Sequence, residues 1–270
     1  AALYVFATHL VYYSFGHILF GGEWAVSCFI VLSGFCLSLP VEIHGKLRGG
    51  VLDFLKRRGK RILPGYYGAL LLSYLLGERP NSRTIISHLF LVHNVSPKWV
   101  YGFDGSTWSL ATEWQIYFVF ALILIPVWQR FGKIATFVIA VFVADAALLC
   151  GLPREACPHL LVSFAFGMMC AWVRPIRLYL WCGIGLLVSV IVSHINGVVW
   201  IDRYSPLSDV VFSAGFGLIV AGMRSGGVLA HVLASKPVTA IGTFSYSLYL
   251  IHMPIVVLLG HVLCWPILTV

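Results

Sequence analysis

The sequence predicts an all-α integral membrane protein, a polytopic bundle of about nine to ten transmembrane helices. Of its 270 residues, 60% are hydrophobic and only 10% are charged, and the mean hydropathy is +0.92. Soluble domains carry about 25% charged residues, so this chain has too few charges to cover a surface that faces water. The apolar runs are continuous rather than alternating, and 237–270 lacks Lys, Arg, Asp and Glu altogether. These observations favour membrane-spanning helices over a β-barrel.

Each long apolar run is a candidate span, because a helix needs about 20 apolar residues to cross a bilayer core. The predicted spans are 1–20, 24–40, 62–77, 108–128, 134–151, 159–173, 178–195, 207–223 and 243–265. We expect a short helix at the membrane surface over 226–240. Segment 85–97 is short and contains two histidines, and it either crosses the membrane or is re-entrant. One membrane domain over 1–270 accounts for the chain, which we interpret as a fragment cut at the first helix and near the end of the last.

The most basic stretch of the chain lies between two predicted spans. Residues 54–64 contain five Lys and Arg residues, and a proline at its end is expected to stop the run before the next span. Cytoplasmic loops collect Lys and Arg, and loop 41–61 lies on the richer side whether or not 85–97 crosses. We therefore place loop 41–61 in the cytoplasm. The net charge of +8 follows from this membrane topology, so no nucleic-acid partner is predicted.

The same basic stretch offers more charge than topology needs. One interpretation is attraction to anionic lipid headgroups. The other is a binding site, because Arg58 and Arg61 lie one helical turn apart and can grip a pair of phosphates.

Three of the ionisable side chains inside predicted spans carry the functional hypothesis, because such groups are costly there and often mark function. His9 is surrounded by apolar residues, and its imidazole is either a general base or a buried neutral group. Glu113 opens its span and is either satisfied by the helix N-terminus or a paired or catalytic carboxylate. His252 follows a run of Ser and Tyr residues, which either form hydrogen bonds between helices or line a site.

Metal and disulfide chemistry find no support in the spacing of the residues. The chain has 7 cysteines and 10 histidines. No two cysteines form a CxxC pair, and no cluster has metal-ligand spacing. We therefore predict no metal and no bound cofactor.

Five motifs, in the right order, resemble the acyltransferase-3 family of integral membrane O-acyltransferases. They are the first-helix histidine at His9, the GxxxVxxFFxLSGF pattern over Gly22–Phe35, RRFxRIxPxYY over Arg57–Tyr67, WSLxxExxxY over Trp108–Tyr117, and SYSLYLIHxP over Ser245–Pro254. Two positions depart from the pattern. The arginine that precedes the histidine in the family would fall upstream of Ala1, and Trp114 stands where the family often has a second acidic residue.

The resemblance implies transfer of an acyl group, chiefly acetyl, from acyl-CoA to a hydroxyl of a carbohydrate, a lipid-linked sugar or a small molecule. The resemblance implies that His9 is the general base and that Glu113 orients His9 or holds the acceptor hydroxyl. It also implies that Arg58 and Arg61 bind the acyl donor. The side chains expected to line the cavity are Ser33, Trp108, Ser109, Tyr117, Tyr246, Tyr249 and His252. The implied partners are membrane lipids, acyl-CoA and the acceptor, in the bacterial inner membrane. The rival hypothesis is a proton-coupled transporter or flippase of a polar or lipid-linked substrate, with His9 and Glu113 as its proton relay.

Overall fold

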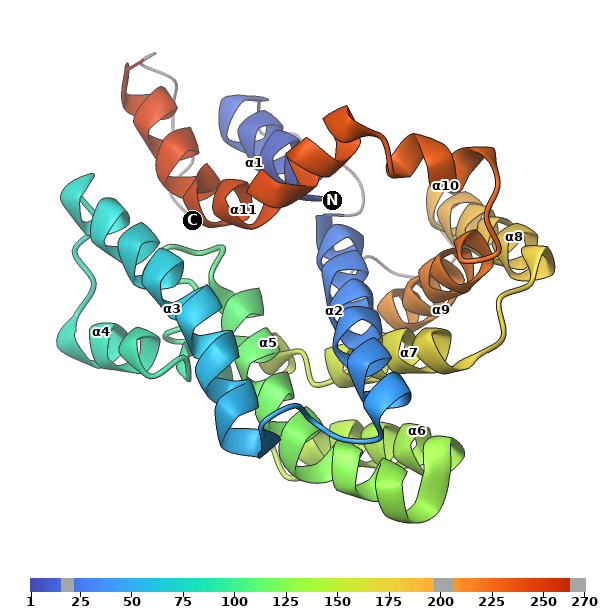
Figure 1. The fold of residues 1–270 in the computed structure, drawn as a ribbon. Helices are drawn as coiled ribbons and strands as arrows, with labels where there is room; N and C mark the ends of the chain where they lie inside the picture. The colour runs from blue at the N-terminus through green and yellow to red at the C-terminus, as the bar shows by residue number, and fades with distance from the viewer. Residues whose placement is uncertain (16–21, 197–205, 263–270) are drawn as a thin grey trace.

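The computed structural model describes residues 1–15, 22–196 and 206–262, and within these ranges every regular element is a helix. The helices are α1 (Ala2–Phe15), α2 (Gly22–His44), α3 (Gly50–Leu75), α4 (Ser82–Leu89), α5 (Trp108–Val119), α6 (Ile125–Leu149), α7 (Leu160–Trp172), α8 (Arg177–Ile195), α9 (Pro206–Met223), α10 (Val228–Leu233) and α11 (Lys236–Val262) (Figure 1). Two 3-10 turns, η1 (His93–Val95) and η3 (Arg154–Ala156), lie in loops, and a π-helical turn, η2 (Phe120–Leu124), joins α5 to α6.

The predicted all-α membrane class is confirmed. Within the described ranges, five helices are long and apolar enough to cross a membrane: Gly22–His44, Trp108–Leu149, Arg177–Ile195, Pro206–Met223 and Lys236–Leu259. The predicted number of spans stays a prediction, and the far ends of the predicted spans 1–20 and 243–265 lie outside the described residues.

The 42-residue stretch Trp108–Leu149 is too long for one crossing. As a straight helix it would measure about 63 Å, roughly twice the hydrocarbon core of a bilayer. Gly132 interrupts it with φ 85° and ψ −178°, a backbone conformation that glycine adopts without a steric penalty. The break falls inside the loop expected between the spans 108–128 and 134–151.

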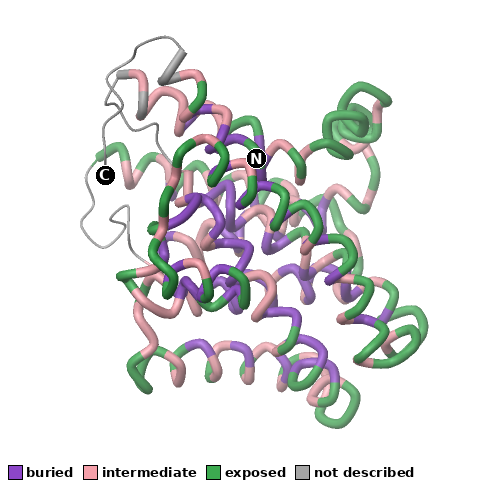
Figure 2. Tube along the Cα trace, turned by 90° about the vertical axis from the view of Figure 1, so that its left-hand side faces the viewer, coloured by how far each residue is buried: buried purple, intermediate pink, exposed green. Residues whose placement is uncertain are grey.

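Helices α2 and α7 form the closest contact in the centre of the bundle. A β-carbon on Gly34 would lie 2.1 Å from the carbonyl oxygen of Phe164, and one on Gly167 would lie 2.0 Å from that of Val31. Only glycine allows the two backbones to approach this closely. Figure 2 shows the buried residues gathered in this central region, with the peripheral turns exposed.

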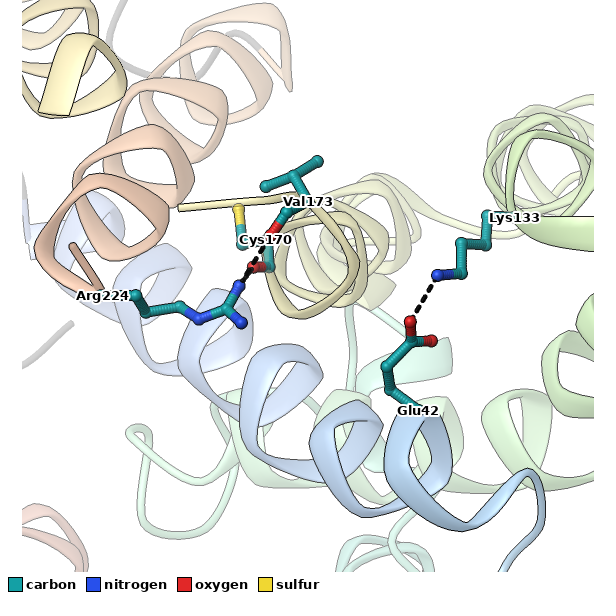
Figure 3. Close-up of polar contacts among 5 residues, drawn as sticks. All are labelled: Glu42, Lys133, Cys170, Val173 and Arg224. Atoms are coloured by element: carbon teal, nitrogen blue, oxygen red, sulfur yellow. Dashed lines mark hydrogen bonds and ion pairs between the residues drawn. The ribbon is translucent and has the colours of Figure 1, made fainter. Parts of the chain in front are cut away.

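Polar contacts tie several helices together at one end of the bundle (Figure 3). Lys133 of α6 donates to the carboxylate of Glu42 on α2 at 2.6 Å. Arg224, just after α9, donates to the carbonyl oxygens of Cys170 and Val173 at 2.7 and 3.0 Å. These bonds satisfy carbonyl groups at the end of α7 that have no partner within their own helix.

Two predictions about the basic stretch need correction. Residues 50–61 are not part of a loop but the first half of α3, and Pro64 lies inside that helix rather than ending the run. Proline removes only its own N–H from the backbone ladder, and the bonds on either side keep the helix continuous.

Segment 85–97 holds only the end of α4 and the turn η1. Because the 8 residues of α4 rise about 12 Å, the segment does not cross the membrane as a helix.

Candidate active site

A cavity of about 270 Å³ lies between α2, α3, α5 and α11. Its polar lining consists of Ser33, Arg58, Arg61, Ser109, Glu113, Tyr117, Ser245, Tyr246 and Tyr249. Its other lining residues are Val26, Phe29, Ile30, Leu32, Cys36, Leu37, Ile62 and Leu110. The wall from α2 is built at helical spacing, since positions 26, 29, 30, 33, 36 and 37 share one face. The cavity therefore combines an apolar slot with a small set of convergent polar groups, as small-molecule sites do.

Glu113 is the centre of one hydrogen-bonded cluster in this cavity. Its Oε1 accepts from the hydroxyl of Tyr117, at 2.5 Å and one turn along α5, and from Ser33 Oγ of α2 at 3.1 Å. The two hydroxyl oxygens are themselves 3.1 Å apart. Donors of this kind offset the cost of removing a carboxylate from water. The cluster fixes one carboxylate oxygen and joins α2 to α5.

Arg58 and Arg61 occupy one face of α3 and line the same cavity. Neither forms an ion pair with another residue in the described ranges. The Nε of Arg58 is buried and has no hydrogen-bond partner among the described residues. Two neighbouring guanidinium groups that form no ion pair within the described ranges are suited to an anionic ligand.

Tyr249 forms the part of the cavity wall that comes from the middle of α11. Its hydroxyl donates to the carbonyl oxygen of Ser106 at 2.9 Å. Ser109 Oγ lies 2.5 Å from the same hydroxyl oxygen, and because the tyrosine proton already goes to Ser106, the serine is the donor. The Tyr249 ring is only 7% exposed. A cavity-lining hydroxyl is therefore held in one orientation by two partners.

His9 and His252 form a pair on α1 and α11. The Nδ1 of His252 lies 2.5 Å from the carbonyl oxygen of Tyr249, so this nitrogen carries a proton and donates it. The Nε2 of His252 is then an acceptor, and it lies 3.2 Å from Nδ1 of His9. Nδ1 of His9 is also 3.0 Å from the carbonyl oxygen of Val5, so it is the protonated nitrogen of His9. This assignment leaves Nε2 of the half-buried His9 with a free lone pair.

The expected site residues fall into two clusters rather than one. The cavity brings together Glu113, both arginines and five of the expected lining residues: Ser33, Ser109, Tyr117, Tyr246 and Tyr249. Trp108 packs against the hydrophobic core, and His252 is fully buried behind Tyr249, so neither is among the lining residues. His9 pairs with His252, and no described contact joins it to Glu113.

Sequence reasoning did not single out Phe29, Cys36 and Ser245, which also line the cavity. The signal for the first two was their helical spacing from Ser33. Within the described ranges, no group of three or more His, Cys, Asp or Glu side chains is arranged to hold a metal ion. The chemistry that the side chains themselves offer is proton transfer at an imidazole, hydrogen bonding at a carboxylate and hydroxyls, and anion binding at two guanidinium groups.

The fold and the cavity define a helical membrane protein with a site for a small molecule. The comparisons with known proteins are more specific. The family described as acyltransferase domain matches residues 1–267, and the chain belongs to this family. It is an O-acyltransferase by family and by relatives.

Two named relatives illustrate the range of the family. The chain is 27% identical over 314 residues to "Acyltransferase MdmB" of Streptomyces mycarofaciens, covering 97% of this chain and 77% of the relative. It is 25% identical over 298 residues to "O-acetyltransferase OatA" of Staphylococcus aureus, covering 92% of this chain and 48% of the relative. The chain thus spans about half the length of OatA. No solved structure gives a significant match.

Proposed function

We propose that this domain transfers an acyl group, chiefly acetyl, from acyl-CoA to a hydroxyl of a carbohydrate, a lipid-linked sugar or a small molecule. The observation that carries the proposal is the cavity, where Arg58 and Arg61 lie beside an apolar slot that ends in hydroxyls and the Glu113 carboxylate. An acyl-CoA has the matching parts, which are phosphates, a largely uncharged thioester arm and a reactive carbonyl. The relatives named acyltransferase and O-acetyltransferase support the same reaction class.

The cavity size bears on how the donor binds. At about 270 Å³ it lies below the roughly 300–1,000 Å³ of pockets that enclose a whole drug-sized ligand. We assign the slot to the acyl thioester arm and the two arginines to the phosphates, with the nucleotide outside. The basic end of α3 then faces the cytoplasm, where acyl-CoA is available, and the protein lies in the bacterial inner membrane with lipids around it.

The proposed reaction needs one base and one leaving group. Nε2 of His9 removes the proton of the acceptor hydroxyl, whose oxygen attacks the thioester carbonyl. The tetrahedral intermediate then collapses, the carbon–sulfur bond breaks, and His9 returns the proton to the thiolate of CoA. His252 keeps His9 in the required tautomer by accepting from its Nδ1. Because Glu113 does not contact His9, we assign its carboxylate to a hydroxyl bound in the cavity.

The arginine pair provides the test of donor binding. Replacing both Arg58 and Arg61 by lysine keeps the charge but removes the bidentate geometry of guanidinium. In membrane vesicles that contain the protein, we expect the KM for radiolabelled acetyl-CoA to rise about tenfold, the loss of roughly one charge-assisted hydrogen bond. Label is counted in the glycan and small-molecule fractions.

Arg57→Lys is the matched control, because Arg57 lies on the same helix but donates to the carbonyl oxygen of Arg48 instead of lining the cavity. An unchanged KM in the double lysine variant would remove the two arginines from the donor site. If wild-type protein neither binds nor consumes acetyl-CoA, acetyl-CoA is not the donor, and the assignment of the two arginines to its phosphates is wrong.

A further inference from the structure

A second buried polar network lies beyond the cavity, in the loop between α4 and α5. The carboxylate of Asp104 is at its centre and is only 1% exposed. Its Oδ1 accepts from Ser106 Oγ at 2.8 Å and from the Ser106 backbone N–H at 3.4 Å, and its Oδ2 accepts from Ser73 Oγ of α3 at 3.2 Å. The backbone N–H of Asp104 donates to the carboxylate of Glu78 at 2.8 Å. The loop is therefore anchored to α3 through one residue.

The backbone of Asp104 has φ 43°, in the left-handed region. Aspartate and asparagine tolerate this region better than most other residues with a β-carbon. An isosteric Asp104→Asn exchange therefore keeps the backbone conformation and the side-chain volume, while it changes the hydrogen-bonding character of the group.

Ser106 connects this network to the candidate active site. Its side chain donates to Asp104, and its carbonyl oxygen accepts the hydroxyl proton of Tyr249. Tyr249 lines the cavity with its ring, and its own carbonyl oxygen accepts from His252, which contacts His9. Two sets of hydrogen bonds therefore meet at Tyr249: its hydroxyl is linked through Ser106 to Asp104, and its backbone carbonyl is linked through His252 to His9.

We propose that Asp104 is a positioning residue for acyl transfer, which holds the Ser106 carbonyl where it orients the hydroxyl of Tyr249, a residue that lines the cavity. The inference rests on the proposed function. The described donors to Asp104 are two hydroxyls and one backbone N–H, so the carboxylate, which only accepts, is the form that satisfies all three. A protonated carboxyl group would present an O–H toward one of these donors and loosen the arrangement.

Charge and burial set the pH at which the Asp104 carboxylate becomes protonated. Burial, and then the nearby Glu78 carboxylate, raise the pKa of Asp104 to about 6, against the lowering effect of the Ser106 hydroxyl. The other titratable groups that face the network are Tyr66 of α3, Tyr249 of α11 and, through Thr107, His93. Burial, and then His88, lower the pKa of His93 to about 3, so His93 stays neutral between pH 5 and 7.

The test is a double-mutant cycle on the full chain in membrane vesicles, with Asp104→Asn, Tyr249→Phe and the double variant. The turnover rate at saturating acetyl-CoA is measured per amount of folded protein. We expect Asp104→Asn to lower this rate about tenfold, a loss of the order of one buried hydrogen bond, with the donor KM within about twofold. The double variant should be no slower than Tyr249→Phe alone, because Asp104 acts through that hydroxyl.

A second readout is the pH profile. Near pH 6 the wild-type rate should show an acid-side fall that comes from Asp104, whereas Asp104→Asn should keep only the fall that comes from protonation of His9, since asparagine does not titrate. Asp209→Asn is the matched control, because Asp209 is another poorly exposed carboxylate, which contacts His159 and has no described contact with Tyr249. Its rate and pH profile should follow the wild type.

Each outcome decides between the two proposals. Turnover in the wild type with additive losses in the double variant overturns the role of Asp104 and leaves the proposed function intact. A wild type without turnover overturns the proposed function and the role of Asp104 with it. Should Asp104→Asn not fold, Ser106→Ala takes its place in the cycle, because it removes only the hydroxyl that donates to the carboxylate.

Discussion

Two pairs of histidines lie in different parts of the molecule and differ in almost every physical respect. The rings of His88 and His93 stack in parallel, with centroids 3.8 Å apart and planes 5° apart, and both are 0% exposed. The rings of His9 and His252 are tilted by 46° at 4.9 Å and are joined by a contact between ring nitrogens. One pair meets face to face, and the other meets edge to edge through a hydrogen bond.

The difference teaches what each pair can do. The Nε2 of His88 and the Nδ1 of His93 are buried and have no hydrogen-bond partner among the described residues, and burial lowers the pKa of both groups. Such rings are neutral packing elements with no access to substrate. In the other pair, His252 is buried and oriented, whereas His9 is half-buried and keeps a free nitrogen. Of the two pairs, His9 and His252 combine one ordered ring with one accessible ring, which is the arrangement that proton transfer to a substrate requires.

The largest expected effect comes from the accessible ring. His9→Gln keeps a polar side chain of similar size but removes the base, so we expect the turnover rate to fall about 1,000-fold, within the range for loss of a general base. The measurement is acetyl transfer from radiolabelled acetyl-CoA at matched protein level. His231→Gln on α10 is the control, because His231 is exposed and bonds only its own helix. Retained activity in His9→Gln would show that His9 is not the base, so that neither histidine pair would take part in proton transfer.

A smaller effect is expected at the ordered ring. His252→Gln removes the acceptor for Nδ1 of His9 but leaves the base, so the rate should fall about tenfold with the donor KM within about twofold. Because His252 acts through His9, combining both substitutions should give no further loss over His9→Gln. Additive losses would show that His252 has an independent task.

The smallest effect is expected at the stacked pair, and on stability rather than on rate. Burial, and then His88, lower the pKa of His93 to about 3, from about 6.5 in an unfolded chain. Between these values the unfolded state binds more protons, so this residue's contribution to stability is complete above about pH 6.5 and is lost as pH falls toward 3. We expect the Tm of His93→Gln to fall less than that of the wild type between pH 6.5 and 4.

The measurement is thermal unfolding in detergent at several pH values. The contribution of Asp104 to stability changes with pH in the opposite direction, because its raised pKa makes the folded state bind more protons between about pH 4 and 6. It is present in both proteins and cancels in the difference between them. Parallel Tm curves for the two proteins would mean that the His93 ring is not held neutral by burial.

Much of the local structure follows from the sequence, because apolar runs and breakers act over short distances. The break at Gly132 falls in the expected loop, and the helical face shared by Arg58 and Arg61 follows from their spacing. Pro64 was misjudged because a proline signal competes with a helix that is continuous on both sides. Local rules predict which element a residue lies in better than where that element ends.

The site itself depends on contacts that no local pattern carries. His9 and His252 are 243 residues apart, and Ser106 and Tyr249 are 143 apart. No local pattern indicated the positioning role that we propose for Asp104, because that role depends on partners in α3 and, through Ser106, in α11. The motifs identified several side chains that line the cavity, but their division into a carboxylate cluster and a histidine pair requires the three-dimensional arrangement.

The glycine contact between α2 and α7 has a mechanical consequence. Backbone atoms meet there without side chains between them, so α2 cannot shift toward α7 through side-chain rotation. The opposite wall differs, because a β-carbon on Gly65 of α3 would meet only side-chain atoms of Leu250 and Tyr246 of α11. We therefore expect any change in cavity width during a reaction cycle to come from movement of α3 and α11. The Glu113 carboxylate, which accepts a hydrogen bond from Ser33 of α2, then keeps its position relative to the substrates.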